Sequence, residues 1–283
     1  MQEKILYYLT PIVKVALFIF FLIVCLVPIW LITSFDFIQI DEKSFSSLLF
    51  SEVGLSISVI SALLMTFRIF RSYDFDRIFI TKEGSLEGFG YGSLIGFALI
   101  IACSGLAFLN GNVSFSLAKI DTALFFGYLL LYISVAICEE LIFRGFVLVV
   151  LAERYPTAFA IFLTSCLFGL AHIGNEGFTM LAMLNISLAG ALFSILILQR
   201  RNMSWAIGLH FGWNFTQGNL LGYEVSGSTS PGLLKATPKG HHYLSGGVFG
   251  IESSIFCTII LTVIIAFLLV KYRFKLSLTF VES

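Results

Sequence analysis

Residues 136–148 read AICEELIFRGFVL and set three charges close together in an otherwise apolar run. The charged residues are Glu139, Glu140 and Arg144. An ionisable side chain at the centre of a membrane helix costs about 2.5–3.5 kcal/mol on insertion scales, so such residues usually serve a function. This stretch therefore raises the question of what three charges do in a chain that is otherwise suited to lipid.

The composition indicates a membrane protein. Hydrophobic residues make up 58% of the 283 positions and charged residues 12%, whereas soluble domains are about half apolar and a quarter charged. The net charge is zero, which gives no reason to expect a nucleic-acid partner. The five cysteines lie in apolar segments without paired spacing. We interpret them as packing residues and not as disulfides or metal ligands.

Runs of about twenty apolar residues mark membrane spans. The predicted fold is an all-α bundle of about eight transmembrane helices, at approximately 11–33, 47–67, 91–110, 122–150, 156–174, 178–199, 203–221 and 251–271. Lys and Arg gather in alternate connections, and such positive connections face the cytoplasm. We therefore expect an integral membrane protein with both termini in the cytoplasm.

Two features between and within these spans concern packing. Residues 68–90 and 222–250 are polar connections, and we interpret both as solvated linkers. Gly92 and Gly96 form a G-x-x-x-G pattern, in which small residues let two membrane helices approach closely. We interpret this pattern as a packing signal.

The three charges of the opening stretch differ in their predicted surroundings. Glu140 and Arg144 are four positions apart, so they share a helical face, and the acid comes first, which is the favourable order for an ion pair. Glu139 lies about 100° away around the helix and has no partner within its own segment. Its carboxylate is therefore the one available for chemistry.

Polar residues of two later spans are predicted to approach Glu139. His210 and Asn214 are four positions apart and share a helical face, and His172 lies in a different span. Glu139 and His172 both stand roughly 25 Å from the turn around Tyr155, since each helical residue rises about 1.5 Å. We expect these four polar groups to converge within the membrane.

The chain carries three short motifs, from Glu139 to Arg144, from Phe168 to His172 and from His210 to Asn214. Together they resemble the motifs of the CAAX protease and bacteriocin-processing family, also called the Abi family, which includes the Ras-converting CAAX endopeptidase. The family's motifs are Glu-Glu-x-x-x-Arg, Phe-x-x-x-His and His-x-x-x-Asn on successive core helices. Here they read EELIFR (139–144), FGLAH (168–172) and HFGWN (210–214), in the same order. The resemblance covers about residues 121–221, and LSGGVFGIESS (244–254) also resembles bacterial members.

The resemblance implies an intramembrane endopeptidase that hydrolyses a peptide bond in a membrane-associated or lipidated peptide or protein. Glu139 with His172 is then expected to activate a water molecule, and His210 with Asn214 to stabilise the oxyanion. Both effects are strong in a site shielded from water. No cofactor is expected, and the setting is expected to be the cytoplasmic membrane of a bacterium.

The helical spacing assigns supporting roles to Glu140 and Arg144, and the resemblance marks out the core of the chain. Glu140 and Arg144 are expected to form an ion pair that holds the site together. Residues 1–120 would form N-terminal helices, 121–221 the catalytic core, and 222–283 an outer loop with the final helix.

Three other interpretations remain open. Two histidines and a carboxylate are a known hydrolytic zinc set, so Glu139, His172 and His210 would be the ligands of Zn²⁺, although Asn214 is a poor zinc ligand. Intramembrane Glu and His residues also serve transporters and proton relays. Polar groups between helices can simply hold a bundle together, as in a scaffold or immunity protein. The sequence indicates neither the physiological substrate nor an oligomeric state.

Overall fold

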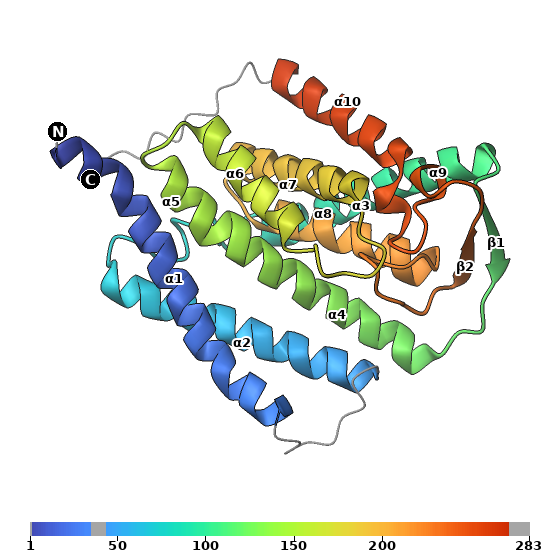
Figure 1. Cartoon of the computed structure of the whole chain (residues 1–283), viewed down its shortest axis with the longest axis horizontal. Coiled ribbons are helices and arrows are strands. Elements are labelled where there is room, and N and C mark those ends of the chain that lie inside the picture. Colours follow the sequence, from blue (N-terminus) through green and yellow to red (C-terminus); the bar gives the residue numbers. More distant parts are fainter. Residues whose placement is uncertain (1, 35–43, 272–283) are drawn as a thin grey trace.

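The computed structural model describes residues 2–34 and 44–271 and shows a bundle of helices (Figure 1). The helices that coincide with predicted spans are α1 (Gln2–Ser34), α2 (Phe45–Ile69), α3 (Ser85–Leu109), α4 (Thr122–Glu140), α6 (Thr157–Leu170), α7 (Met180–Arg200), α8 (Ser204–Phe215) and α10 (Ile255–Lys271). Within the described ranges, four helices, α1, α2, α3 and α7, are long and apolar enough by themselves to cross a membrane. The all-α membrane bundle is thus supported, and the count of eight crossings stays a prediction.

Two of these helices continue through π-helical segments. After α4 the backbone runs on through a π-helix at Leu141–Val147 into α5 (Leu148–Ala152), and α8 continues into a π-helix at Thr216–Leu220. The carboxylate of Asp121 caps the start of α4 by accepting a hydrogen bond from the Leu124 N–H at 3.0 Å. π-helical turns inside α-helices occur frequently at functional sites. Here the first begins directly after Glu140, and the second begins two residues after Asn214.

Helices α3 and α8 pack at close range through glycine. A Cβ atom added to Gly92 would collide with the backbone of Trp205, and one added to Gly96 would collide with the backbone of Leu209. Any larger residue would force the two helices apart, so the packing interpretation of the G-x-x-x-G pattern is confirmed. The contact fixes α8, which carries His210.

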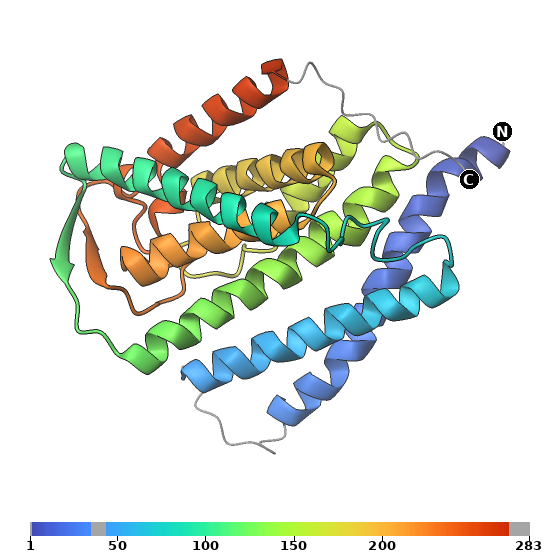
Figure 2. The ribbon, with the colours of Figure 1, turned by 180° about the vertical axis from the view of Figure 1, so that it is seen from behind.

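A two-stranded ribbon closes one end of the bundle. Strand β1 (Val113–Leu117) pairs antiparallel with β2 (Leu234–Pro238), with Phe115 opposite Ala236. Both views place this ribbon far from the turn between α5 and α6 (Figures 1 and 2). The short helix α9 (His242–Ser245) and a 3₁₀ turn (Ile251–Ser253) follow before α10.

The interpretation of residues 222–250 as a solvated linker is wrong. Val225, Ala236 and Phe249 are buried in the described structure. The segment gains backbone partners by pairing with β1, and its apolar side chains pack against the helices. We refer to residues 222–254 as the capping loop.

Residues 68–90 are also more ordered than a solvated linker. Tyr73, Ile78 and Phe79 in this connection are buried. The Tyr73 hydroxyl donates a hydrogen bond of 2.5 Å to Oε2 of Glu153, which follows α5. Lys14 of α1 lies 3.1 Å from the same oxygen, and Arg77 lies 2.8 Å from Oε1. Glu153 therefore joins three separate parts of the chain.

This network predicts a pH-dependent contribution to stability. Burial by itself would raise the pKa of Glu153, but the hydrogen bonds from Tyr73 and Arg77, together with the charge of Lys14, hold its pKa below the usual value. A carboxylate with a lowered pKa in the folded state stabilises the fold above its unfolded pKa and loses this effect as the pH falls through its folded pKa. We expect Glu153→Gln to lower the free energy of unfolding by about 1.5–3 kcal/mol at neutral pH.

The measurement is thermal unfolding of detergent-solubilised protein between pH 7 and pH 3. The difference between the wild type and Glu153→Gln should be constant at neutral pH and shrink below about pH 4.5, the ordinary pKa of a glutamate. Glu83→Gln serves as the control, because Glu83 is exposed. A difference that stays the same down to pH 3 would show that the charge of Glu153 does not stabilise the fold.

Candidate active site

The two adjacent glutamates stand at the junction of α4 and its π-helical continuation. Glu139 and Glu140 are the last residues of α4, and Arg144 lies within the π-helix that follows. Oε1 of Glu140 accepts a hydrogen bond of 2.9 Å from Nη1 of Arg144, and both side chains are completely buried. The same oxygen lies 3.1 Å from Nδ1 of His210 on α8. Glu140 thus connects its own helix to α8.

Aromatic rings surround the buried guanidinium of Arg144. Its Cζ atom lies 4.0 Å from the ring centre of Phe168 and 5.3 Å from that of Phe193. Rings in these positions attract a cation through their π faces, and the attraction is larger when the cation is desolvated. Gly190 leaves room for the group, because an added Cβ would lie 2.5 Å from Nη2 of Arg144. The positive charge is therefore balanced by one carboxylate and several aromatic faces.

His172 does not lie in a helix, contrary to the prediction of a span at 156–174. Helix α6 ends at Leu170, and His172 belongs to the turn that follows. Its Nδ1 lies 2.8 Å from the carbonyl oxygen of Phe168. A carbonyl can only accept, so Nδ1 carries a proton, and in the neutral ring Nε2 keeps a lone pair. The ring satisfies a carbonyl at the helix end, which explains why the helix can stop here.

His210 faces both glutamates, one with each ring nitrogen. Nδ1 donates to Glu140, because a carboxylate can only accept. Nε2 lies 3.6 Å from Oε2 of Glu139, longer than a hydrogen bond. The Glu139 side chain is 25% exposed, and its Oε2 has no hydrogen-bond partner within the described residues. Glu140 is thus engaged in structural contacts, while Glu139 has an oxygen available.

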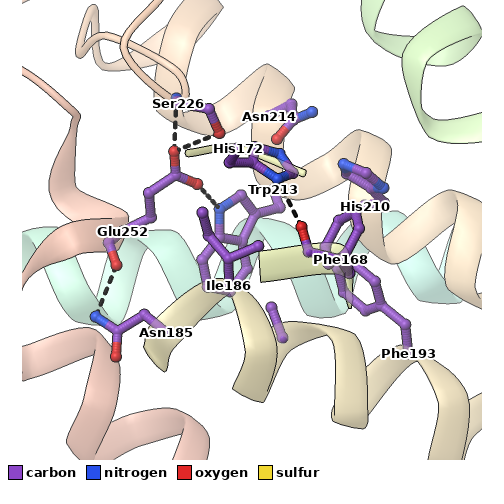
Figure 3. Close-up of a pocket in the computed structure, with 11 residues that line it drawn as sticks. Phe168, His172, Asn185, Ile186, Phe193, His210, Trp213, Asn214, Ser226 and Glu252 are labelled. Carbon is purple, nitrogen blue, oxygen red and sulfur yellow. Dashed lines mark hydrogen bonds between the residues drawn. The ribbon is translucent and has the colours of Figure 1, made fainter. Parts of the chain in front are cut away.

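A cavity of about 270 Å³ brings the predicted site residues together. Its wall is built from α2, α4, the turn after α6, α8 and the capping loop, and it includes Glu139, His172, His210 and Asn214. A smaller cavity of about 30 Å³ adjoins the same two histidines and Asn214 (Figure 3). Four groups from three separate segments therefore border one space that can hold part of a peptide and a water molecule.

Sequence reasoning missed two carboxylates of the site region. Glu52 on α2 borders the larger cavity, and its Oε1 is buried without a hydrogen-bond partner in the described part of the chain. Glu252 borders the smaller cavity. Both lie within predicted spans, at 47–67 and 251–271. A search of every span for ionisable residues, the criterion that selected Glu139, would have found them.

The predicted zinc ligands Glu139, His172 and His210 do not form a cluster in the described part of the chain. In residues 2–34 and 44–271, no three His, Cys, Asp or Glu side chains come close enough to one another to share a metal ion. Nδ1 of His210 is engaged by Glu140 and Nδ1 of His172 by a carbonyl, and metal-bound histidines commonly make the same contacts, so these bonds do not decide between the two mechanisms. Asn214 lines the cavity with an amide, which is a weak zinc ligand beside imidazole, thiolate and carboxylate.

Together, the fold and the site define an all-α membrane protein that encloses a polar cavity of histidines, carboxylates and an amide among its helices. Residues 121–216 match the family described as "Type II CAAX prenyl endopeptidase Rce1-like". This segment, about a third of the chain, is similar to the CAAX protease family, so the resemblance of the three motifs is confirmed. No curated protein and no solved structure matches the chain.

Proposed function

We propose that this protein is an intramembrane endopeptidase that hydrolyses a peptide bond in a membrane-associated or lipidated peptide or protein. The observation that carries the proposal is the position of Glu139, which borders a cavity shared with His172, His210 and Asn214. The family match over residues 121–216 supports the same class of reaction. A carboxylate with a buried oxygen and no hydrogen-bond partner among the described residues is suited to take up a proton.

The reaction begins with a water molecule between Glu139 and the substrate. Glu139 removes one proton from the water, and the oxygen attacks the carbonyl carbon of the scissile bond to form a tetrahedral oxyanion. Nε2 of His172, which keeps a lone pair, accepts a hydrogen bond from the same water and orients it. The C–N bond then breaks, and Glu139 returns its proton to the leaving amine.

Stabilisation of the oxyanion is assigned to α8. The amide of Asn214 can donate directly to the developing negative charge. His210 donates from Nε2 when its ring carries both protons, and Nδ1 is already fixed toward Glu140. The Glu140 carboxylate supplies the counter-charge for that imidazolium. Arg144 in turn fixes Glu140, so the ion pair holds His210 in place without touching the substrate.

The test combines a defined substrate with an open search. Purified protein in liposomes is incubated with an internally quenched farnesylated peptide that ends in a CAAX sequence. In parallel, membrane peptides are compared by mass spectrometry between cells that carry the wild type and cells that carry Glu139→Ala. We expect cleavage products that require Glu139. The absence of any such product in both experiments would count against an endopeptidase.

We expect cleavage to proceed without a bound metal, because the donors do not converge as a zinc site requires. The measurement is elemental analysis of purified, active protein, followed by the peptide assay after treatment with a chelator. Glu139→Gln reports cleavage by contaminating proteases. Stoichiometric zinc whose removal abolishes cleavage, and whose return restores it, would establish the zinc mechanism instead.

A further inference from the structure

Glu252 is a buried carboxylate beside the site that lies outside the family-matched segment (Figure 3). Only 6% of the surface of Glu252 is exposed. Oε1 accepts hydrogen bonds from the backbone N–H of Ser226 at 2.6 Å and from the Ser226 hydroxyl at 2.9 Å. Oε2 accepts a bond of 3.2 Å from the indole N–H of Trp213. Three donors on one carboxylate form a strong, charge-assisted anchor.

Ser226 is held in a conformation that needs such an anchor. Its φ angle is +48°, in the left-handed region that residues with a Cβ rarely occupy. Strained positions of this kind persist only where the surrounding contacts impose them. The Ser226 carbonyl accepts a bond of 2.9 Å from Asn175, in the same turn as His172. Ser226 borders both cavities, so its position shapes the space beside the catalytic groups.

The other contacts of Glu252 tie the capping loop to two helices. Trp213 on α8 directly precedes Asn214. Asn185 on α7 donates to the carbonyl oxygens of Glu252 at 2.7 Å and Ser254 at 2.8 Å. The backbone of Glu252 is therefore fixed to α7, while its side chain reaches across to α8 and to the tip of the loop.

We propose that Glu252 is a positioning residue that holds the capping loop closed over the site, so that Ser226 and its neighbours Val225 and Ser228 form a wall of the substrate cavity. The assignment of this wall to substrate binding rests on the proposed endopeptidase function. Both carboxylate oxygens of Glu252 are engaged by Ser226 and Trp213, so we assign Glu252 no contact with the scissile bond or the attacking water. Its effect on cleavage should therefore appear in substrate binding and leave the pH profile unchanged.

The first measurement follows the loop without any substrate. Hydrogen exchange is recorded by mass spectrometry for a peptide covering residues 223–230 in the wild type, Glu252→Gln, Glu252→Asp and the exposed control Glu83→Gln. A glutamine amide offers one acceptor oxygen, so it cannot serve Ser226 and Trp213 together. We expect about tenfold faster exchange in Glu252→Gln, the factor that corresponds to one lost hydrogen bond, and no change in Glu83→Gln.

The second measurement separates binding from chemistry with the quenched farnesylated peptide. Glu252→Gln should raise KM about tenfold, with kcat changed less than about threefold. Glu252→Asp keeps the charge but shortens the reach, and Ser226→Ala removes only the hydroxyl. Both should shift exchange and KM in the same direction by smaller factors, even if Glu252→Gln folds poorly.

The outcomes distinguish this inference from the proposed function. Unchanged hydrogen exchange at residues 223–230 in Glu252→Gln, Glu252→Asp and Ser226→Ala would overturn the inference, whatever the activity of these variants. Faster exchange with an unchanged KM would show that the loop is not a wall of the substrate cavity, and would also overturn it. Faster exchange in a protein whose wild type cleaves nothing would support the anchoring by Glu252 and count against the endopeptidase.

Discussion

Glu139→Gln is expected to lower the rate of peptide cleavage by about 10²–10⁴-fold, the usual contribution of a general base. The variant keeps the shape of the side chain and removes its capacity to take a proton from water. The melting temperature should stay the same or rise slightly. Oε2 of Glu139 has no hydrogen-bond partner in the described part of the chain, and residues kept for catalysis are often unfavourable for stability.

The matched control is the neighbouring residue. Glu140 bonds to both Arg144 and His210, so Glu140→Gln should lose both stability and cleavage. Melting temperature and quenched-peptide cleavage are measured side by side for the two variants. If Glu139→Gln retains near-normal cleavage while Glu140→Gln is stable and inactive, the two glutamates have exchanged roles and the assignment from helical faces is wrong.

Arg144→Ala is expected to cost about 3–5 kcal/mol of folding free energy, the typical effect of removing one partner of a buried ion pair. The change leaves the completely buried Glu140 carboxylate without its guanidinium and removes the cation from the face of Phe168. The melting temperature in detergent should fall on the order of 10 °C, with a lower yield of folded protein. Cleavage should fall as well, because Glu140 would no longer hold His210 in place.

Two further variants test whether the effect arises from the charge. Arg144→Ala combined with Glu140→Gln should be more stable than the sum of the single effects predicts, since no uncompensated charge remains, with a coupling of about 0.5–3 kcal/mol. Arg68 is an exposed cation near the end of α2, and Arg68→Ala should change stability by less than about 0.5 kcal/mol. Strictly additive effects of the two site substitutions would contradict a buried ion pair.

The order and position of the helices could be predicted from the sequence. In a bilayer every backbone N–H and C=O must be satisfied within the protein, so long apolar runs form helices almost regardless of their neighbours. Each predicted span indeed contains a helix in the described structure, although the ends of some differ. The spacing of four between Glu140 and Arg144, and between His210 and Asn214, is likewise a local property of a helix.

Predictions of where helices end and of how loops fold were less successful. The helix before His172 stops at Leu170, because the histidine ring itself satisfies the carbonyl of Phe168. The polar composition of residues 222–250 suggested a solvated linker, yet the segment packs onto the helices. Composition reports the average polarity of a segment, whereas burial depends on the few apolar side chains that find a neighbour.

The sequence by itself determined that this is a membrane-embedded helical protein with three polar motifs on its later segments, because periodicity and hydrophobicity act within one segment. Only the tertiary structure decided which groups meet. It placed His210 against Glu140 and left one oxygen of Glu139 without a hydrogen-bond partner among the described residues. It also added Glu52 from α2 to the wall of the larger cavity and brought Ser226 into hydrogen-bonding contact with Glu252. These contacts join residues dozens of positions apart, and their partners follow from how the helices pack and how the capping loop folds back, which no local pattern encodes.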